Sequence, residues 1–122
     1  MLAELRHPLA PELVRNWATN PPPWVEVLSP KSSFSLVQLD PGENEAIALA
    51  SEVHADILLI DEQAGRQVAV RTGLKVAGTL SVLDEADQAG LVDFDGAVAE
   101  LQKTSFRVSR VVLSAIRGKR SR

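Results

Sequence analysis

The sequence predicts a single α/β domain in which helices flank a small parallel sheet. The apolar run at 57–60 is uninterrupted, as in a strand that is buried on both faces of a parallel sheet. Helical patterns at 41–53 and 62–71 alternate with this run and with a second apolar segment at 74–77, an order typical of parallel α/β folds. The length of 122 residues suits one domain with one core.

The N-terminal part is predicted to contain one helix and one strand. Pro11 stands where a helix start tolerates proline, and Leu13 and Trp17 share one face after it. Three consecutive prolines at 21–23 end this helix, since proline cannot continue it. The alternation of apolar and polar residues at 24–28 predicts a half-exposed strand.

Capping residues predict where the other helices begin. Asp40 is a candidate cap for the helix at 41–53, and Glu43 lies where a capping box places its carboxylate. Asp61 has the same structural explanation at the start of the helix at 62–71. Further helices are expected at 81–89, 95–103 and 109–117, the last with Ser109 as its cap.

Charge is distributed unevenly along the chain. Residues 101–122 hold seven of the thirteen basic residues and no acidic residue, which gives +7 there and −10 in residues 1–100. A basic segment at 103–122 is therefore expected to contact phosphates or an acidic partner. A solvated C-terminal helix without a ligand is the alternative.

Several chemistries are excluded by the sequence. Because cysteine is absent, there is no thiolate metal site, cysteine nucleophile or disulfide. Phosphate-binding glycine loops, a zinc-binding His-Glu-x-x-His and a serine nucleophile elbow are also missing. His7 and His54 are isolated and are interpreted as structural. No membrane-length apolar run or secretory leader is present, so we expect a cytoplasmic protein without a membrane partner.

Carboxylates remain as candidate catalytic groups. Asp61 follows the strand at 57–60, at the edge of a parallel sheet where ligands bind. Glu43 and Glu45 lie in the first turn of the preceding helix, which reaches the same edge if that helix runs antiparallel to the strand. Clustered carboxylates suit Mg²⁺ or Mn²⁺, which serve phosphodiester chemistry. Each acid can also be explained as a residue favoured at a helix N-terminus.

Several segments together resemble the PIN-domain family. They are Leu39–Ala50, Leu58–Glu62, Gly65-Arg66, Val76–Leu80 and Thr104–Arg107, so the resemblance covers most of residues 1–118. It is greatest to a branch related to VapC toxins and described as predicted nucleic-acid-binding proteins. The resemblance implies a single three-layer PIN-like domain over 1–122 and a metal-dependent nuclease acting mostly on RNA.

The resemblance also implies roles for individual residues. By position, Glu43, Asp61 and Glu4 resemble the family's catalytic and metal-binding acids, with Glu45 as a lesser metal ligand. The implied cofactor is Mg²⁺ or Mn²⁺. The implied partners are RNA and a cognate bacterial antitoxin. The basic residues expected to contact nucleic acid are Arg66, Lys103, Arg107, Arg110 and Arg117.

One family feature has no counterpart in this sequence. PIN domains begin with an apolar strand that ends in a metal-binding aspartate, ahead of the position of Glu4. We therefore expect an N-terminally truncated form of the fold and a reading frame that extends upstream of Met1. The strand at 57–60 would then have an open apolar edge, which a homodimer or a strand-swapped oligomer would cover.

Two other functions remain open at this level. The chain could be a catalytically inactive PIN-like module that binds nucleic acid or protein, because the aspartate of the first strand is absent. Alternatively, all of these acids could be helix caps in an unrelated α/β domain.

Overall fold

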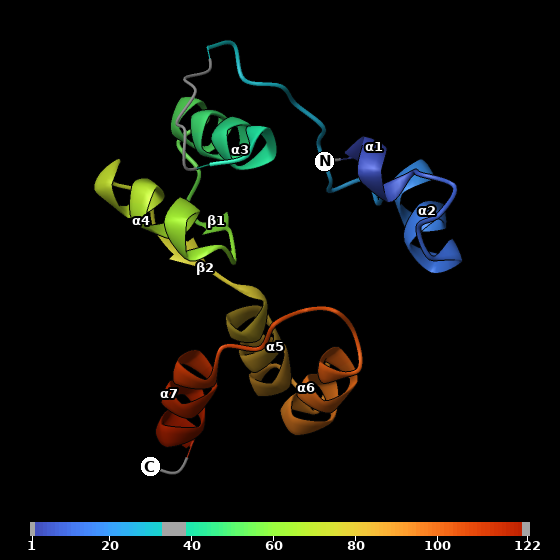
Figure 1. Cartoon of the computed structure of the whole chain (residues 1–122), viewed down its shortest axis with the longest axis vertical. Helices are drawn as coiled ribbons and strands as arrows, with labels where there is room; N and C mark the ends of the chain where they lie inside the picture. Colours follow the sequence, from blue (N-terminus) through green and yellow to red (C-terminus); the bar gives the residue numbers. More distant parts are fainter. Residues whose placement is uncertain (1, 33–38, 121–122) are drawn as a thin grey trace.

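The computed structural model describes residues 2–32 and 39–120. Figure 1 shows α1 and α2 apart from the other helices, then a group formed by α3, α4 and both strands, and then α5, α6 and α7. The elements in chain order are α1 (Leu2–Leu5), α2 (Glu12–Thr19), α3 (Pro41–Glu52), β1 (Leu58–Leu59), α4 (Gln63–Arg71), β2 (Val76–Ala77), α5 (Thr79–Gln88), α6 (Phe94–Gln102) and α7 (Arg110–Arg120).

A two-stranded parallel sheet confirms the predicted α/β class. Leu58 pairs with Val76 and Leu59 pairs with Ala77. Helix α4 connects the two strands, as a crossover between parallel neighbours requires. Helix α3 contacts β1 and helix α4 contacts β2, so helices pack against the small sheet as expected.

The strand predicted at 57–60 is shorter and more exposed than expected. Only Leu58 and Leu59 have strand geometry, and the predicted strand at 74–77 is likewise reduced to Val76–Ala77. Ile57 is 54% exposed and Leu59 is 64% exposed, whereas Ile60 is buried. Because Ile57 and Leu59 are open to solvent, the expectation of burial on both faces is wrong. Within the described residues β1 also pairs along one edge only, with β2.

The strand predicted at 24–28 is not formed. Trp24 is 80% exposed and Val27 is 61% exposed, and no strand pairs with this segment in the described ranges. An alternating pattern makes a strand only where a neighbour completes its hydrogen bonds. Helix α2 does follow Pro11, but its Leu13 is 84% exposed, so the apolar face of this helix lies open.

Local hydrogen bonds explain both ends of α3. The Glu43 N–H donates to Asp40 Oδ1 at 2.8 Å, which confirms the predicted cap. At the other end His54 has a left-handed backbone with a φ of 54°, and the Ala55 N–H donates to the Ala50 carbonyl at 2.9 Å. His54 therefore occupies the position that ends a helix in a Schellman motif, where glycine is the usual residue.

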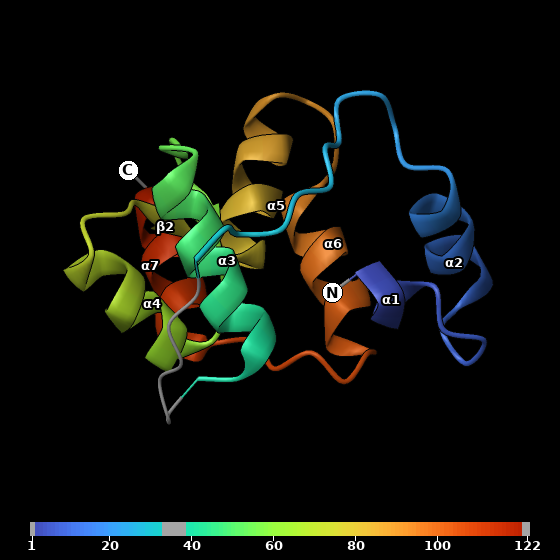
Figure 2. The ribbon, with the colours of Figure 1, turned by 90° about the horizontal axis from the view of Figure 1, so that it is seen from above.

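The hydrophobic core is divided into two clusters. The first joins α3, α4 and the sheet, and the second joins α5, α6 and α7. Within the second group, α5 and α6 lie side by side (Figure 2). The first cluster contains Leu39, Ile47, Ile60, Val68 and Ala69, and the second contains Leu80, Phe94, Val98, Leu113 and Ile116.

The chain exposes more surface than a compact monomer does. Its accessible surface is 9217 Å². A folded monomer of 13.2 kDa is expected to expose about 6,400 Å². The apolar side chains left open on α2, β1 and the stretch at 24–28 contribute to this excess.

Arg120 fastens the end of α7 to the second cluster. Its guanidinium donates to Asp84 Oδ1 at 2.6 Å and to Asp87 Oδ1 at 3.2 Å, and it lies 4.6 Å from the centre of the Phe94 ring. Helix α7 ends at Arg120, beyond the predicted range of 109–117. This residue of the basic segment has a structural role, because its charge is balanced within the fold.

Within residues 2–32 and 39–120, no helix combines the length and the apolar character needed to cross a lipid bilayer.

Candidate active site

Asp61 lies where the two strands end, and its carboxylate is held by the start of α5. The Thr79 N–H donates to Asp61 Oδ1 at 2.9 Å, and the Thr79 hydroxyl donates to Oδ2 at 2.8 Å. The predicted cap of α4 is therefore wrong, because Asp61 binds the N-terminus of a helix that begins 18 residues later in the chain. Two hydrogen bonds to one carboxylate fix its position.

Gly78 makes this close approach possible. A methyl group at position 78 would lie 2.7 Å from Asp61 Oδ1 and 3.7 Å from Arg66 Nη1. A side chain at this position would push the carboxylate away from Thr79. At the carboxyl end of β2, Gly78 thus leaves room for the Asp61 carboxylate and Thr79 binds it.

An acidic hollow of about 420 Å³ opens beside Asp61. Three of the acids predicted from the sequence, Glu4, Glu43 and Asp61, line this hollow. The full lining is Glu4, Asp40, Gly42, Glu43, Ala46, Leu59, Ile60, Asp61 and Glu62. Helices α1 and α3 and the end of β1 thus bring together acids that are far apart in the sequence.

The environment of Glu43 favours its neutral form. Burial raises the pKa of Glu43 above its ordinary value of 4.5, and the negative charges of Asp40 and Glu62 raise it further. A methyl group at Gly65 would lie 3.4 Å from Glu43 Oε2, so the carboxylate lies over the start of α4. The hollow therefore has an excess of negative charge that a cation would relieve.

The predicted metal ligands do not all converge. Glu45 is exposed on α3 and does not line the hollow. Among the described residues, no three acidic or histidine side chains are close enough together to hold one ion. Glu4, Glu43 and Asp61 share a hollow without forming a three-carboxylate ligand set.

The chemistry of the hollow nevertheless fits a divalent cation. Mg²⁺ keeps several waters and is commonly held by one or two protein carboxylates together with substrate phosphates. The unbalanced charge around Glu43 and the fixed carboxylate of Asp61 match that requirement. Glu43 and Asp61 would hold such an ion, and Glu4 lines the same hollow from α1.

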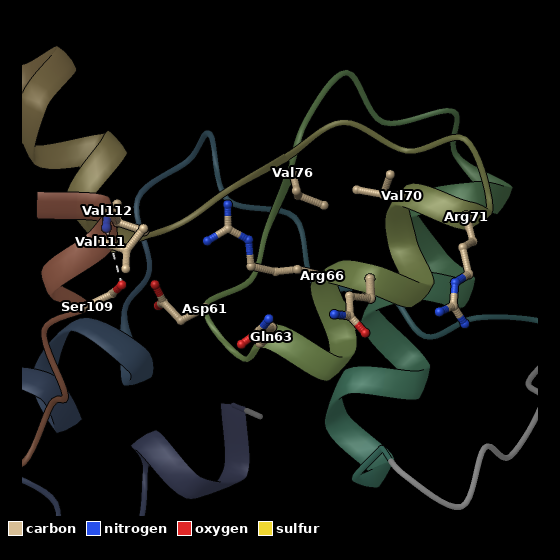
Figure 3. A pocket seen from close by; sticks show the side chains of 10 residues that line it. Asp61, Gln63, Arg66, Val70, Arg71, Val76, Ser109, Val111 and Val112 are labelled. Carbon is tan, nitrogen blue, oxygen red and sulfur yellow. Dashed lines mark hydrogen bonds between the residues drawn. The ribbon is translucent and has the colours of Figure 1, made fainter. Parts of the chain in front are cut away.

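On its other side, Asp61 borders a groove between α4 and α7, the α4–α7 groove, with a volume of about 850 Å³. In Figure 3 the Arg66 side chain extends from α4 toward Asp61 and Ser109, while Arg71 lies at the far end of the groove. The lining residues are Asp61, Gln63, Arg66, Gln67, Val70, Arg71, Val76, Ser109, Val111 and Val112.

Two of the five predicted nucleic-acid contacts lie beside Asp61. Arg66 and Arg107 line a small cavity of about 60 Å³ that also borders Asp61. Lys103 and Arg117 lie elsewhere, paired with Glu100 at 2.7 Å and with Asp95 at 3.2 Å. Arg110 is exposed at the start of α7.

The sequence interpretation did not include several residues of this region. Thr79, Gly78 and Gln67 were not among the candidates, although Thr79 holds Asp61 and Gln67 lines the groove. The Gly78-Thr79 pair directly follows an apolar strand that parallels β1. Ligand sites form at the shared carboxyl edge of such strands, so the position of this pair in the sequence could have marked it as part of the site.

Comparison with known proteins identifies the family. The family model DUF3368, whose description is PIN domain, matches residues 7–121. The chain belongs to the PIN-domain family. No curated protein and no solved structure matches the chain.

Membership of the PIN family indicates a nuclease-type module, and PIN domains generally depend on divalent metal ions. Asp61 and Glu43 of this PIN domain lie in one acidic hollow at the strand ends, the edge where an open parallel sheet binds ligands.

Proposed function

We propose that this PIN domain is a Mg²⁺- or Mn²⁺-dependent ribonuclease of the VapC type, the toxin of a bacterial toxin–antitoxin pair. The observation that supports the proposal is the position of Asp61. It lies between the acidic hollow, which suits a divalent cation, and a groove with two arginines, which suits a phosphate backbone.

In this proposal Thr79 keeps the Asp61 carboxylate fixed, so that no reorganisation is needed when substrate binds. Glu43 lines the same hollow, where burial and then the negative charges of Asp40 and Glu62 raise its pKa; a cation bound there would offset that charge. When bound, a divalent cation activates water and stabilises negative charge on the phosphate. Arg66 and Arg107 position the scissile phosphate next to Asp61.

Cleavage of single-stranded RNA tests this proposal. We expect cleavage in Mn²⁺ that EDTA abolishes and that Asp61→Asn reduces by at least about a hundredfold. Asp56→Asn is the matched control, because Asp56 is an exposed acid that does not line the hollow. Cleavage that resists EDTA, or that Asp61→Asn leaves intact, contradicts a metal-dependent nuclease centred on Asp61.

A second function is favoured by one specific observation. Thr79 already occupies both oxygens of Asp61, and among the described residues no three acids converge on one point. A PIN-like module that binds nucleic acid or protein without cleaving is consistent with this arrangement. RNA binding by the wild-type chain without cleavage in either Mg²⁺ or Mn²⁺ would support this alternative.

The partners are part of the same proposal. The basic segment at 103–122 would contact RNA or the carboxylates of an antitoxin, since it contains no acid of its own. A homodimer or a strand-swapped oligomer would cover the open edge of β1, where Leu59 is 64% exposed. Sedimentation equilibrium tests the oligomer, and a monomer at all concentrations argues against it.

A further inference from the structure

We propose that the α4–α7 groove binds one unpaired nucleotide of a single-stranded RNA, with its phosphate on Arg66 and its base on the valine side chains. This inference rests on the proposed function for the class of substrate. It adds the location of the strand and the residues that read its base.

Arg66 is the anion-binding residue of this groove. Its side chain is partly buried, and within residues 2–32 and 39–120 it makes no hydrogen bond or ion pair. The neighbouring carboxylate of Asp61 is engaged by Thr79. A partly buried guanidinium that no acid among these residues engages is available to an anion, and its planar fork of N–H groups can bind two oxygens of a phosphate.

The charge balance of the groove favours a polyanion. Arg66 and Arg71 face one acid, Asp61, and Arg107 adds a third cation in the adjoining cavity. In Figure 3, Arg66 lies near Asp61 and Arg71 lies at the far end of α4, so these two cations follow the length of the groove. A strand held along this line would bring a phosphate next to the acidic hollow, because Asp61 borders both.

The remaining lining suits a nucleobase. Val70, Val76 and Val111 provide an apolar surface in the groove, and Val70 and Val111 are 58% and 80% exposed. Gln63 and Gln67 provide amides that both donate and accept hydrogen bonds, as the edge of a base requires. These groups can reach a base only if it is unstacked and unpaired, so a single strand is selected over a duplex.

The test is binding of a fluorescently labelled single-stranded RNA to the full chain in EDTA, measured by anisotropy. Arg66→Met keeps the aliphatic part of the side chain and should weaken binding by about tenfold or more. The plot of log affinity against log salt concentration should also become less steep, by about the amount expected for the loss of one phosphate contact. Lys75→Met is the matched control, because Lys75 is an exposed cation that does not line the groove, and it should bind as wild type does.

Two further measurements separate base binding from charge alone. Gln67→Ala should reduce the difference in affinity among homopolymeric RNAs. The wild-type chain should bind a duplex that contains the labelled RNA sequence about tenfold more weakly than it binds the single strand. Arg66→Lys, which keeps the charge, should give intermediate affinity. Thermal melts of each variant establish that it is folded.

Specific outcomes would overturn the groove proposal. They are wild-type affinity of Arg66→Met, equal affinity for duplex and single strand, no RNA binding by the wild-type chain, or equal competition by a polyglutamate peptide. Failure of the nuclease proposal is distinguishable, because binding in EDTA needs no cleavage. Cleavage that depends on Asp61 together with unchanged RNA binding by Arg66→Met would reject the groove and the phosphate-binding role of Arg66, and would leave the nuclease proposal centred on Asp61 in place.

Discussion

Thr79 binds both carboxylate oxygens of Asp61, through its backbone N–H at 2.9 Å and its hydroxyl at 2.8 Å. The contact joins the carboxyl end of β1 to the first residue of α5. It therefore links the first hydrophobic cluster to the second and fixes the carboxylate that borders both the hollow and the groove.

Removal of the Thr79 hydroxyl should affect activity more than stability. Thr79→Val keeps the backbone donor and deletes one hydrogen bond, so the free energy of unfolding should fall by about 1 kcal/mol. The freed Asp61 carboxylate should rotate, and RNA cleavage should fall by at least about tenfold. Urea unfolding and cleavage assays measure the two effects.

Thr72→Val is the control for this substitution. The Thr72 hydroxyl donates to the carbonyls of Val68 and Ala69 at 2.9 and 2.8 Å, within its own helix end and away from Asp61. It should lose comparable stability while keeping its cleavage rate. Equal loss of activity in both variants would mean that Thr79 acts only through stability.

Gly78→Ala should displace Asp61. The added methyl group would lie 2.7 Å from Asp61 Oδ1, so the carboxylate must leave Thr79 or the backbone must shift. We expect a loss of about 1–3 kcal/mol in unfolding free energy, together with loss of cleavage. Gly118→Ala in α7 provides the contrast, since nothing lies within 4 Å of its added methyl group. That variant should gain about 0.5–1 kcal/mol.

Glu43→Gln should stabilise the fold at neutral pH. The pKa of Glu43 is raised above 4.5 by burial and then by Asp40 and Glu62, so the folded state favours the protonated acid. This favourable contribution is present below pH 4.5 and is lost as the pH rises through the folded-state pKa. Urea unfolding should therefore show a higher free energy of unfolding for Glu43→Gln than for the wild type, with a larger difference at pH 7.5 than at pH 4.

A divalent cation should stabilise the wild type more than Glu43→Gln. If Glu43 holds Mn²⁺, the ion should raise the melting temperature of the wild type more than that of Glu43→Gln. Glu45→Gln should respond as wild type does, because Glu45 does not line the hollow. An identical Mn²⁺ response in all three proteins would exclude Glu43 as a ligand.

Arg120→Met should lower the melting temperature in a pH-dependent manner. The pKa of Asp87 is lowered by the hydrogen bond from the Phe94 N–H and further by Arg120. The stability from this carboxylate is present above its ordinary value of 3.8 and is lost as the pH falls toward the folded-state pKa. Calorimetry should show that Arg120→Met lowers the melting temperature at pH 7, and that the decrease is smaller at pH 3.

Lys119→Met is the neighbouring control for Arg120. It removes an equal charge from the exposed end of α7 and should leave the melting temperature nearly unchanged. A similar drop for both variants would show that net charge, rather than the contact of Arg120 with Asp84 and Asp87, determines the effect.

Local signals in the sequence determined most helix positions. Asp40 caps α3 as predicted, and the Ser109 hydroxyl accepts from the Val112 N–H at 3.3 Å at the start of α7. Such caps depend on three or four neighbouring residues, so their sequence spacing is sufficient to predict them. The acids Glu43 and Asp61 could likewise be chosen from their places next to a helix start and a strand end.

Only the tertiary structure decided which of these residues meet. Asp61 binds the N-terminus of α5 rather than that of α4, and Arg120 binds Asp84. These partners are 18 and 36 residues apart and are brought together by packing. The segment at 24–28 stays irregular although its pattern alternates, since a strand requires a neighbour that no local pattern can provide. The sequence by itself determined the helices and the candidate acids, and the fold determined their partners, because caps are local whereas strand pairing and ion pairs depend on contacts between distant parts of the chain.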